Sequence, residues 1–283
     1  MDATLRTMDG RAVLRLERRL AHPPARVWRA LTEPAELSRW FPATVSLELF
    51  VGAEVRFDFG DAAPGGRITV LDPPRVFEFT WGDDLLRWEL RPEGGGCVLV
   101  FTHTFDDRAG AASFASGWRG CLDALELVLD GRPVELTRPP ADLHDAYVDA
   151  FDLDAGVWEA DGEGWRVRFE RQLTRPASEV WDGLAASPPR VGDPPPTLFT
   201  TAAAPPGAVS ARQRPGLLEY AWRHDGRVAG RVRWELSDER GTGHGARLIL
   251  TQTGPHDLEG VRDTALVAWR EHLRDLARRL RER

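Results

Sequence analysis

The sequence contains no lysine and no asparagine, and each absence removes a class of mechanism. All 37 residues in the Lys+Arg total are arginines. A Schiff-base lysine, a phosphate-loop lysine and a catalytic asparagine are therefore excluded. The two cysteines, Cys97 and Cys121, are too few for a disulfide framework or a thiolate metal site. We expect both to be buried free thiols, because apolar residues surround them.

Long hydrophobic runs and an excess of positive charge are also absent. No apolar run approaches the roughly 18 residues of a membrane-spanning helix, and residues 1–11 lack the apolar core of a secretory signal. The net charge is −7, from 44 acidic and 37 basic residues, which argues against nucleic acid as a partner. The histidines show no metal-ligand spacing. We expect a cytoplasmic protein that spans no membrane and needs no metal or cofactor.

What the sequence does contain is an internal repeat. Residues 16–31 (LERRLAHPPARVWRAL) and 169–184 (FERQLTRPASEVWDGL) share seven identities at an offset of 153, and Trp28 pairs with Trp181. Further matches follow in the same order: RWEL at 87–90 and 233–236, LVFTHT at 99–104 with LILTQT at 248–253, and Trp118-Arg119 with Trp269-Arg270. The repeat predicts two copies of one domain, at 1–153 and 154–283, with a linker helix near residues 143–151 at the end of the first.

Each copy has the pattern of a strand, short helices, several antiparallel strands and one long helix. Alternating apolar and charged residues predict a strand at 14–20, whose apolar face Arg18 interrupts. Short turns separate the strands predicted at 76–81, 85–90 and 97–105, which favours antiparallel pairing. An apolar stripe predicts a helix at 114–129. This helix must cover the concave face of the sheet, because nothing else in the copy can.

Two segments carry a family resemblance. The run PPARVWRALTEPAELSRWF (23–41) resembles the opening motif of SRPBCC domains, and most of all that of the heat-shock-protein ATPase activator homologue family. The segment GWRGCLDAL (117–125) resembles the C-terminal helix of that family. The resemblance covers residues 12–131 well and 166–282 more weakly. It implies an α+β fold of two tandem helix-grip domains, as in START-like proteins, each a curved antiparallel sheet wrapped around a long C-terminal helix, with a cavity for apolar small molecules.

The second copy departs from this pattern after its first helix. Where the first copy has a short helix predicted at 33–40, the second has SPPRVGDPPP at 187–196. Five prolines and one glycine would break or restrict a helix, so we expect the second short helix to be lost. Because that helix normally closes one end of the cavity, the second site should be more open, or vestigial.

The residues expected to line the first cavity are mainly aromatic. His103 shares a strand face with Phe101 and Phe105, beside Trp118, since side chains alternate along a strand. It is a candidate for ligand contact or proton transfer, and the alternative is a structural histidine held by a neighbour. Its counterpart in the second copy, Gln252, cannot act as an acid or base. The predicted ligand-binding residues are Trp40, Phe41, Phe57, Phe59, Trp81, His103, Phe105, Trp118 and Arg119.

These residues leave three functions open. Trp40 and Phe41 have no counterpart in the second copy and are expected at the pocket mouth, whereas Trp81 has Trp222 as a counterpart, which favours core packing. The first function is a binding protein for an apolar or aromatic small molecule, with the main cavity in the first domain. The second is a cyclase or dehydratase acting on a polyketide-like substrate, with His103 and Arg119 assisting proton transfer. The third is a protein-interaction module similar to an ATPase co-chaperone, with its cavity filled by side chains.

Overall fold

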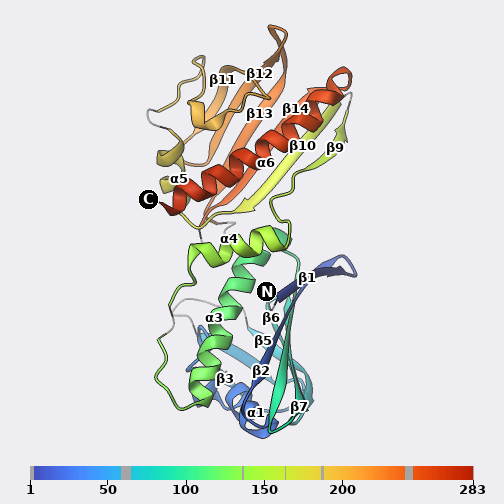
Figure 1. The fold of residues 1–283 in the computed structure, drawn as a ribbon, viewed down its shortest axis with the longest axis vertical. Helices are drawn as coiled ribbons and strands as arrows, with labels where there is room; N and C mark the ends of the chain where they lie inside the picture. The colour runs from blue at the N-terminus through green and yellow to red at the C-terminus, as the bar shows by residue number, and fades with distance from the viewer. Residues whose placement is uncertain are drawn as a thin grey trace. The chain divides into compact units, whose positions relative to one another are not determined.

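The chain forms two separate units with a similar order of elements. The computed structural model describes residues 3–58, 65–135, 137–162, 164–185, 188–239 and 245–282. The units are Met1–Pro140 and Ala141–Arg283, and each has its own antiparallel sheet and its own long helix (Figure 1). This is the predicted α+β fold of two tandem helix-grip domains.

The helix predicted near residues 143–151 is α4 (Ala141–Ala150), and it belongs to the second unit. The division therefore falls after Pro140, before the predicted boundary at residue 153. The physical reason is an ion pair of Asp145, on α4, with Arg171 and Arg281 of the second unit.

The first unit contains one sheet of eight strands in the order β1-β2-β8-β7-β6-β5-β4-β3, with every neighbouring pair antiparallel. Its strands are β1 (Ala3–Met8), β2 (Arg11–Leu20), β3 (Thr44–Leu47), β4 (Glu54–Asp58), β5 (Gly66–Asp72), β6 (Val76–Trp81), β7 (Asp84–Glu93) and β8 (Gly96–Phe105). Its helices are α1 (Pro24–Thr32), α2 (Pro34–Leu37) and α3 (Ala111–Leu129), with a 3₁₀ turn η1 (Arg108–Gly110). Strand β1 was not predicted, because its polar residues follow the exposed edge of the sheet.

The charged residue within the apolar face of β2 has a structural explanation. Leu14 and Leu16 are fully buried on that face. Arg18 follows them on the same face and pairs with Asp123 at 2.9 Å and with Glu126 at 3.4 Å, both on α3. The arginine therefore joins the strand to the helix that covers it.

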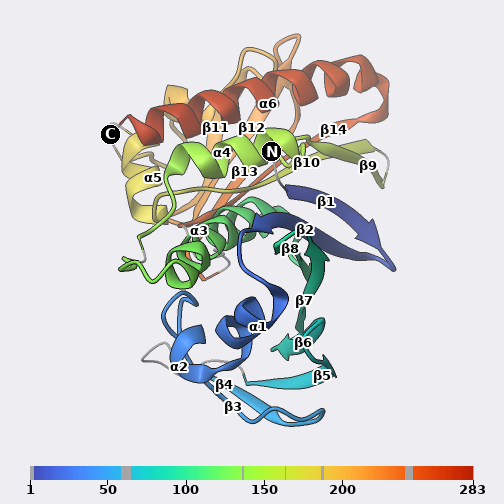
Figure 2. The same cartoon turned by 60° about the horizontal axis from the view of Figure 1, so that its bottom comes forward.

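Helix α3 lies over the concave face of the sheet, as its apolar stripe predicted. Trp118, Leu122 and Leu125 are buried in that stripe. The helix ends at Leu129, and Gly131 follows with a φ of 70°, a conformation that glycine adopts without a side-chain clash. Helix α1 packs against α3, and α2 packs against β3 (Figure 2).

The second unit contains six strands in the order β11-β12-β13-β14-β10-β9, again antiparallel. Its strands are β9 (Val157–Asp161), β10 (Gly164–Gln172), β11 (Pro206–Gln213), β12 (Leu217–His224), β13 (Arg227–Ser237) and β14 (Arg247–Pro255). Its other elements are α4, α5 (Ala177–Leu184), η2 (Thr197–Phe199), η3 (His256–Leu258) and α6 (Glu259–Arg281). Within the described part of the proline-rich segment, residues 188–196, there is no helix. The loss of the second short helix is confirmed there.

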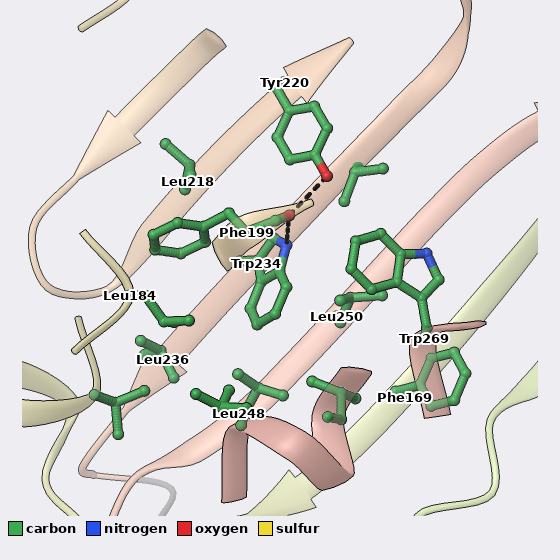
Figure 3. Packing of buried hydrophobic residues seen from close by; sticks show 14 of the residues in the cluster. Phe169, Leu184, Phe199, Leu218, Tyr220, Trp234, Leu236, Leu248, Leu250 and Trp269 are labelled. Atoms are coloured by element: carbon green, nitrogen blue, oxygen red, sulfur yellow. Dashed lines mark hydrogen bonds between the residues drawn. The ribbon is translucent and has the colours of Figure 1, made fainter. Parts of the chain in front are cut away.

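A different residue restores the packing that this lost helix would have supplied. Phe199 of η2 packs edge-on against Trp234, with ring centroids 5.3 Å apart and planes at 80°. Trp40 packs in the same way on Trp88 in the first unit, at 5.5 Å and 81°. The carbonyl of Phe199 also accepts hydrogen bonds from the Tyr220 hydroxyl and the Trp234 indole (Figure 3). Trp40 therefore has a spatial counterpart that the sequence alignment does not contain.

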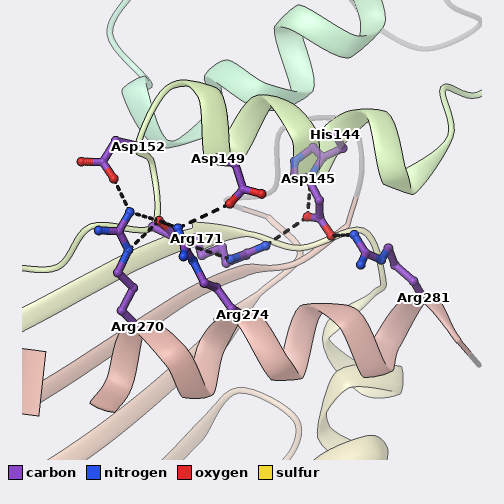
Figure 4. Close-up of polar contacts among 9 residues, drawn as sticks. His144, Asp145, Asp149, Asp152, Arg171, Arg270, Arg274 and Arg281 are labelled. Carbon is purple, nitrogen blue, oxygen red and sulfur yellow. Dashed lines mark hydrogen bonds and ion pairs between the residues drawn. The ribbon is translucent and has the colours of Figure 1, made fainter. Parts of the chain in front are cut away.

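Acidic residues of α4 and the loop after it bind the basic face of α6 (Figure 4). The side chain of Asp154 has no solvent exposure and pairs with Arg270 and Arg274. Burial alone would raise the pKa of Asp154, but hydrogen bonds from the two arginines outweigh it, and the pKa lies below its ordinary value of 3.8. These ion pairs hold α4 and the loop after it against α6 within the second unit.

Candidate functional site

The first unit encloses a cluster of aromatic rings between α3 and the sheet. Phe41 follows α2, Phe57 lies on β4, Trp81 ends β6 and Trp118 lies on α3. Phe41 and Phe57 are stacked with centroids 5.6 Å apart, and Phe57 and Trp81 are stacked at 5.1 Å. The ring centroid of Trp118 lies 5.7 Å from that of Phe41 and 6.3 Å from that of Trp81. The fold thus brings together four of the residues predicted to line the cavity.

The cluster continues into the centre of the sheet and is buried over most of its extent. The ring centroid of Trp118 lies 4.5 Å from that of Phe101 and 5.8 Å from that of Trp88. Trp40 and Phe41 are 0% and 1% exposed, so both rings lie in the core and away from the mouth where we expected them. The Trp40 indole donates to a backbone carbonyl at 2.9 Å. These rings are therefore part of the packed core between α3 and the sheet.

Trp81 differs from the buried rings because it is partly exposed. It is the last residue of β6, where the chain turns into β7. One side of its ring stacks on Phe57, as described above. Trp81 therefore connects the stacked interior with the surface of the unit.

His103 is held by hydrogen bonds at both ring nitrogens. Trp118 donates its indole N–H to Nδ1 at 3.1 Å, so Nδ1 is unprotonated. Nε2 carries the hydrogen and donates it to Asp84 Oδ2 at 2.9 Å. Burial lowers the pKa of His103 below its ordinary value of 6.5, against the opposing effect of Asp84. His103 is thus a neutral, 1% exposed side chain with both nitrogens paired.

The second unit contains the same tryptophan hydrogen bond with a different acceptor. Trp269 on α6 donates its indole N–H to Gln252 Oε1 at 2.6 Å. Gln252 stands at the repeat position of His103, and Trp269 at that of Trp118. Both units therefore place a hydrogen-bond acceptor beside a buried tryptophan. Gln252 shows that this acceptor does not have to be an acid or a base.

The remaining predicted residues, Phe105, Arg119 and Phe59, are not part of the stacked series described above. Phe105 lies on the same strand face as His103, and the centroids of the two rings are 4.8 Å apart. Arg119 follows Trp118 on α3 and pairs with Asp123, whose carboxylate also pairs with Arg18. Arg119 therefore belongs to a row of charged residues along the helix. Phe59 lies outside the described residues.

Sequence reasoning missed Asp84 as the partner of His103. Asp84 opens β7 after a turn of two residues, where a polar residue is ordinary. The signal lay in the register, because Leu86 pairs with His103 and Asp84 is two residues before it on the same face. Both cysteines are buried free thiols, as expected, and burial raises the pKa of Cys121 to about 12.

Among the residues that the structure describes, no three His, Cys, Asp or Glu side chains gather in a metal-ligating group. Across the same residues, no helix is long and apolar enough to span a membrane.

The fold and this aromatic interior define the first unit as a helix-grip domain. Residues 21–130 match the family described as activator of Hsp90 ATPase homolog 1-like protein. The match lies within the first unit and confirms the family resemblance of the sequence motifs there. No curated protein matches the chain at a significant level.

Solved structures with a similar fold come from several bacteria. A conserved protein of unknown function from Enterococcus faecalis is 23% identical, with a TM-score of 0.47 over 53% of this chain and 90% of that one. CalU16 from Micromonospora echinospora is 19% identical, with a TM-score of 0.42 over 53% of this chain and 93% of that one. An uncharacterised protein from Rhizobium leguminosarum is 24% identical, with a TM-score of 0.38 over 47% of this chain and all of that one.

Proposed function

We propose that the protein is a non-catalytic binding protein for a small, planar aromatic molecule, taken up by the aromatic cluster of the first unit. The observation that carries this proposal is the stacked series Phe41, Phe57 and Trp81, which runs from the core to a partly exposed ring. Aromatic faces favour offset stacking with another planar ring. A planar ligand would stack on the partly exposed Trp81 ring, which itself stacks on Phe57.

The state of His103 favours binding over catalysis. A general acid or base must reach the substrate proton with a free nitrogen. Both nitrogens of His103 are already paired, with Asp84 and with Trp118. Gln252 forms the corresponding bond in the second unit without any acid–base capacity. These contacts support a structural histidine and weigh against the cyclase or dehydratase alternative.

Flavone is a suitable probe, because it is planar and uncharged and has no hydrogen-bond donor. Isothermal titration of the full chain should give saturable binding, and Trp81→Ala should weaken it about tenfold, the loss of one good stacking contact. Trp158→Ala is the matched control, since Trp158 is a 52% exposed tryptophan of the second unit. Equal binding by all three proteins, or no binding to the unmodified chain, would reject the proposal. Native mass spectrometry of the purified protein would identify a natural ligand.

A second candidate function is protein interaction, and one surface feature favours it. Leu49, Phe50 and Val51, between β3 and β4, are 45%, 54% and 60% exposed. Consecutive exposed apolar residues are unusual on a monomer surface. The name of the matching family suggests an Hsp90-type ATPase as the partner to test. The purified chain should then change the ATPase rate, and Phe50→Ser should abolish that change; an unaltered rate would exclude this candidate.

The domain arrangement and location are inferred along with the function. We infer that the two units are diverged copies of one ancestral domain, because the same contacts recur at matching repeat positions. We infer a cytoplasmic location from the composition and from the absence of a membrane-spanning helix among the described residues.

A further inference from the structure

The second unit contains a pocket beside its long C-terminal helix. It has a volume of about 340 Å³ and lies between α5, η2 and the last turns of α6. Its apolar walls are four leucines: Leu184, Leu198, Leu276 and Leu280. This volume is at the lower end of the range for small-molecule sites, roughly 300–1,000 Å³.

The pocket follows from the way the two copies differ in sequence. In the first unit the large Trp40 side chain is buried, and its indole donates to the carbonyl of Ala30. The repeat position of Ala30 is Gly183, which lies on the pocket wall. The residue that takes the place of Trp40 is the smaller Phe199. Loss of the second short helix and two smaller side chains thus leave open space beside α6.

His272 supplies the polar atom of this pocket. Its repeat position in the first unit is the buried Cys121. The His272 Nε2 lies 2.8 Å from the carbonyl oxygen of Leu198, so Nε2 carries the hydrogen. Burial lowers the pKa of His272 below 6.5, which keeps the ring neutral. Nδ1 is therefore a lone-pair acceptor, and among the described residues it has no hydrogen-bond partner.

The orientation of this acceptor is fixed, and the charges around it balance. The His272 ring packs edge-on against the rings of Trp234 and Trp269, with centroid distances of 6.0 and 5.6 Å. On the rim, Asp275 pairs with Arg278 of the same helix, and Arg279 and Glu282 carry opposite charges. A ligand therefore meets apolar walls, the His272 imidazole and a rim of charged side chains of both signs.

We propose that this pocket binds a small, uncharged apolar alcohol or phenol. The hydroxyl group donates a hydrogen bond to His272 Nδ1, and the hydrocarbon body packs against the leucines. A hydrogen-bond acceptor on the wall of an apolar pocket favours a ligand with a donor over an otherwise identical ligand without one. The site is independent of the aromatic cluster in the first unit.

The probes are 1-naphthol and its methyl ether 1-methoxynaphthalene, which differ in the hydroxyl hydrogen that the proposal requires. Isothermal titration of the full chain should show 1-naphthol binding about tenfold more tightly than the ether, the value of one net hydrogen bond. His272→Phe keeps an aromatic ring but removes the acceptor. It should weaken 1-naphthol about tenfold and leave the ether unchanged.

Two further variants keep the result interpretable. His256→Phe is the matched control, because His256 is an exposed histidine on η3, away from the pocket lining. Gly183→Met adds a side chain to the pocket wall and should weaken both probes, even if His272→Phe disturbs folding. Trp81→Ala should leave the preference for 1-naphthol intact. Equal affinity of the unmodified chain for the two probes, no binding, or a preference that survives His272→Phe and Gly183→Met would overturn the proposal.

Discussion

Replacing His103 tests whether its role is to accept the hydrogen bond of a buried tryptophan. His103→Gln keeps an acceptor for the Trp118 indole, in the arrangement that Gln252 already has with Trp269. His103→Leu has a comparable size but no acceptor. The structural role predicts that the two variants differ sharply in stability, whereas a catalytic role makes no such distinction.

The magnitude follows from the groups left unpaired. In His103→Leu the Trp118 N–H, on a 4% exposed residue, loses the acceptor that His103 Nδ1 provides, which costs about 1–3 kcal/mol. Asp84 also loses a partner, but its side chain is 28% exposed, so hydration limits this cost to about 0.5–1 kcal/mol. We expect a total loss of about 2–3 kcal/mol for His103→Leu and about 1 kcal/mol or less for His103→Gln.

The assay is urea unfolding of the full chain followed by tryptophan fluorescence, fitted with two transitions because the two units need not unfold together. Gln252→His and Gln252→Leu are the matched pair in the second unit. They should shift the other transition in the same order, with the leucine variant the less stable. Equal destabilisation by His103→Gln and His103→Leu would refute the acceptor role.

Two further predictions concern titration and the ion pairs of α6. Because burial lowers the pKa values of His103 and His272 in the folded state, their contributions to stability are complete above the unfolded pKa of 6.5. They decrease as the pH falls through that value, since the unfolded chain then binds protons that the folded chain does not. The free energy of unfolding should therefore drop between pH 7.5 and 5.5, and His103→Gln should reduce that drop; an unchanged drop would mean that His103 is not responsible. Asp154→Asn should destabilise the second unit by about 2–3 kcal/mol in urea unfolding, because it removes a fully buried charge from its ion pairs with Arg270 and Arg274, whose other carboxylate partners are exposed. Asp149→Asn, at a 68% exposed position, should cost less than about 0.5 kcal/mol, and equal losses would contradict the role assigned to burial.

Local patterns predicted most of the architecture. The alternation at 14–20 and the apolar stripe at 114–129 became β2 and α3, because burial of one face is a local property of strands and helices. The prolines at 187–196 predicted a missing helix for an equally local reason. Strand β1 was not predicted, because an exposed edge strand buries too little to impose a pattern.

The candidate site was predictable in composition but not in arrangement. The sequence identified the aromatic residues and placed His103 beside Trp118. It could not show that the rings of Phe41, Phe57 and Trp81 stack on one another, because ring packing depends on residues from distant elements. For the same reason it placed Trp40 at a mouth when its ring lies in the core.

The amino-acid sequence by itself determined the two-domain repeat pattern, the fold class and the chemistry that the absence of lysine and asparagine excludes. Only the tertiary structure decided how that chemistry is used. It paired both nitrogens of His103 and left Nδ1 of His272 as an acceptor in a pocket. The physical reason is that hydrogen-bond partners and cavities form between elements far apart in the chain, where local periodicity carries no information.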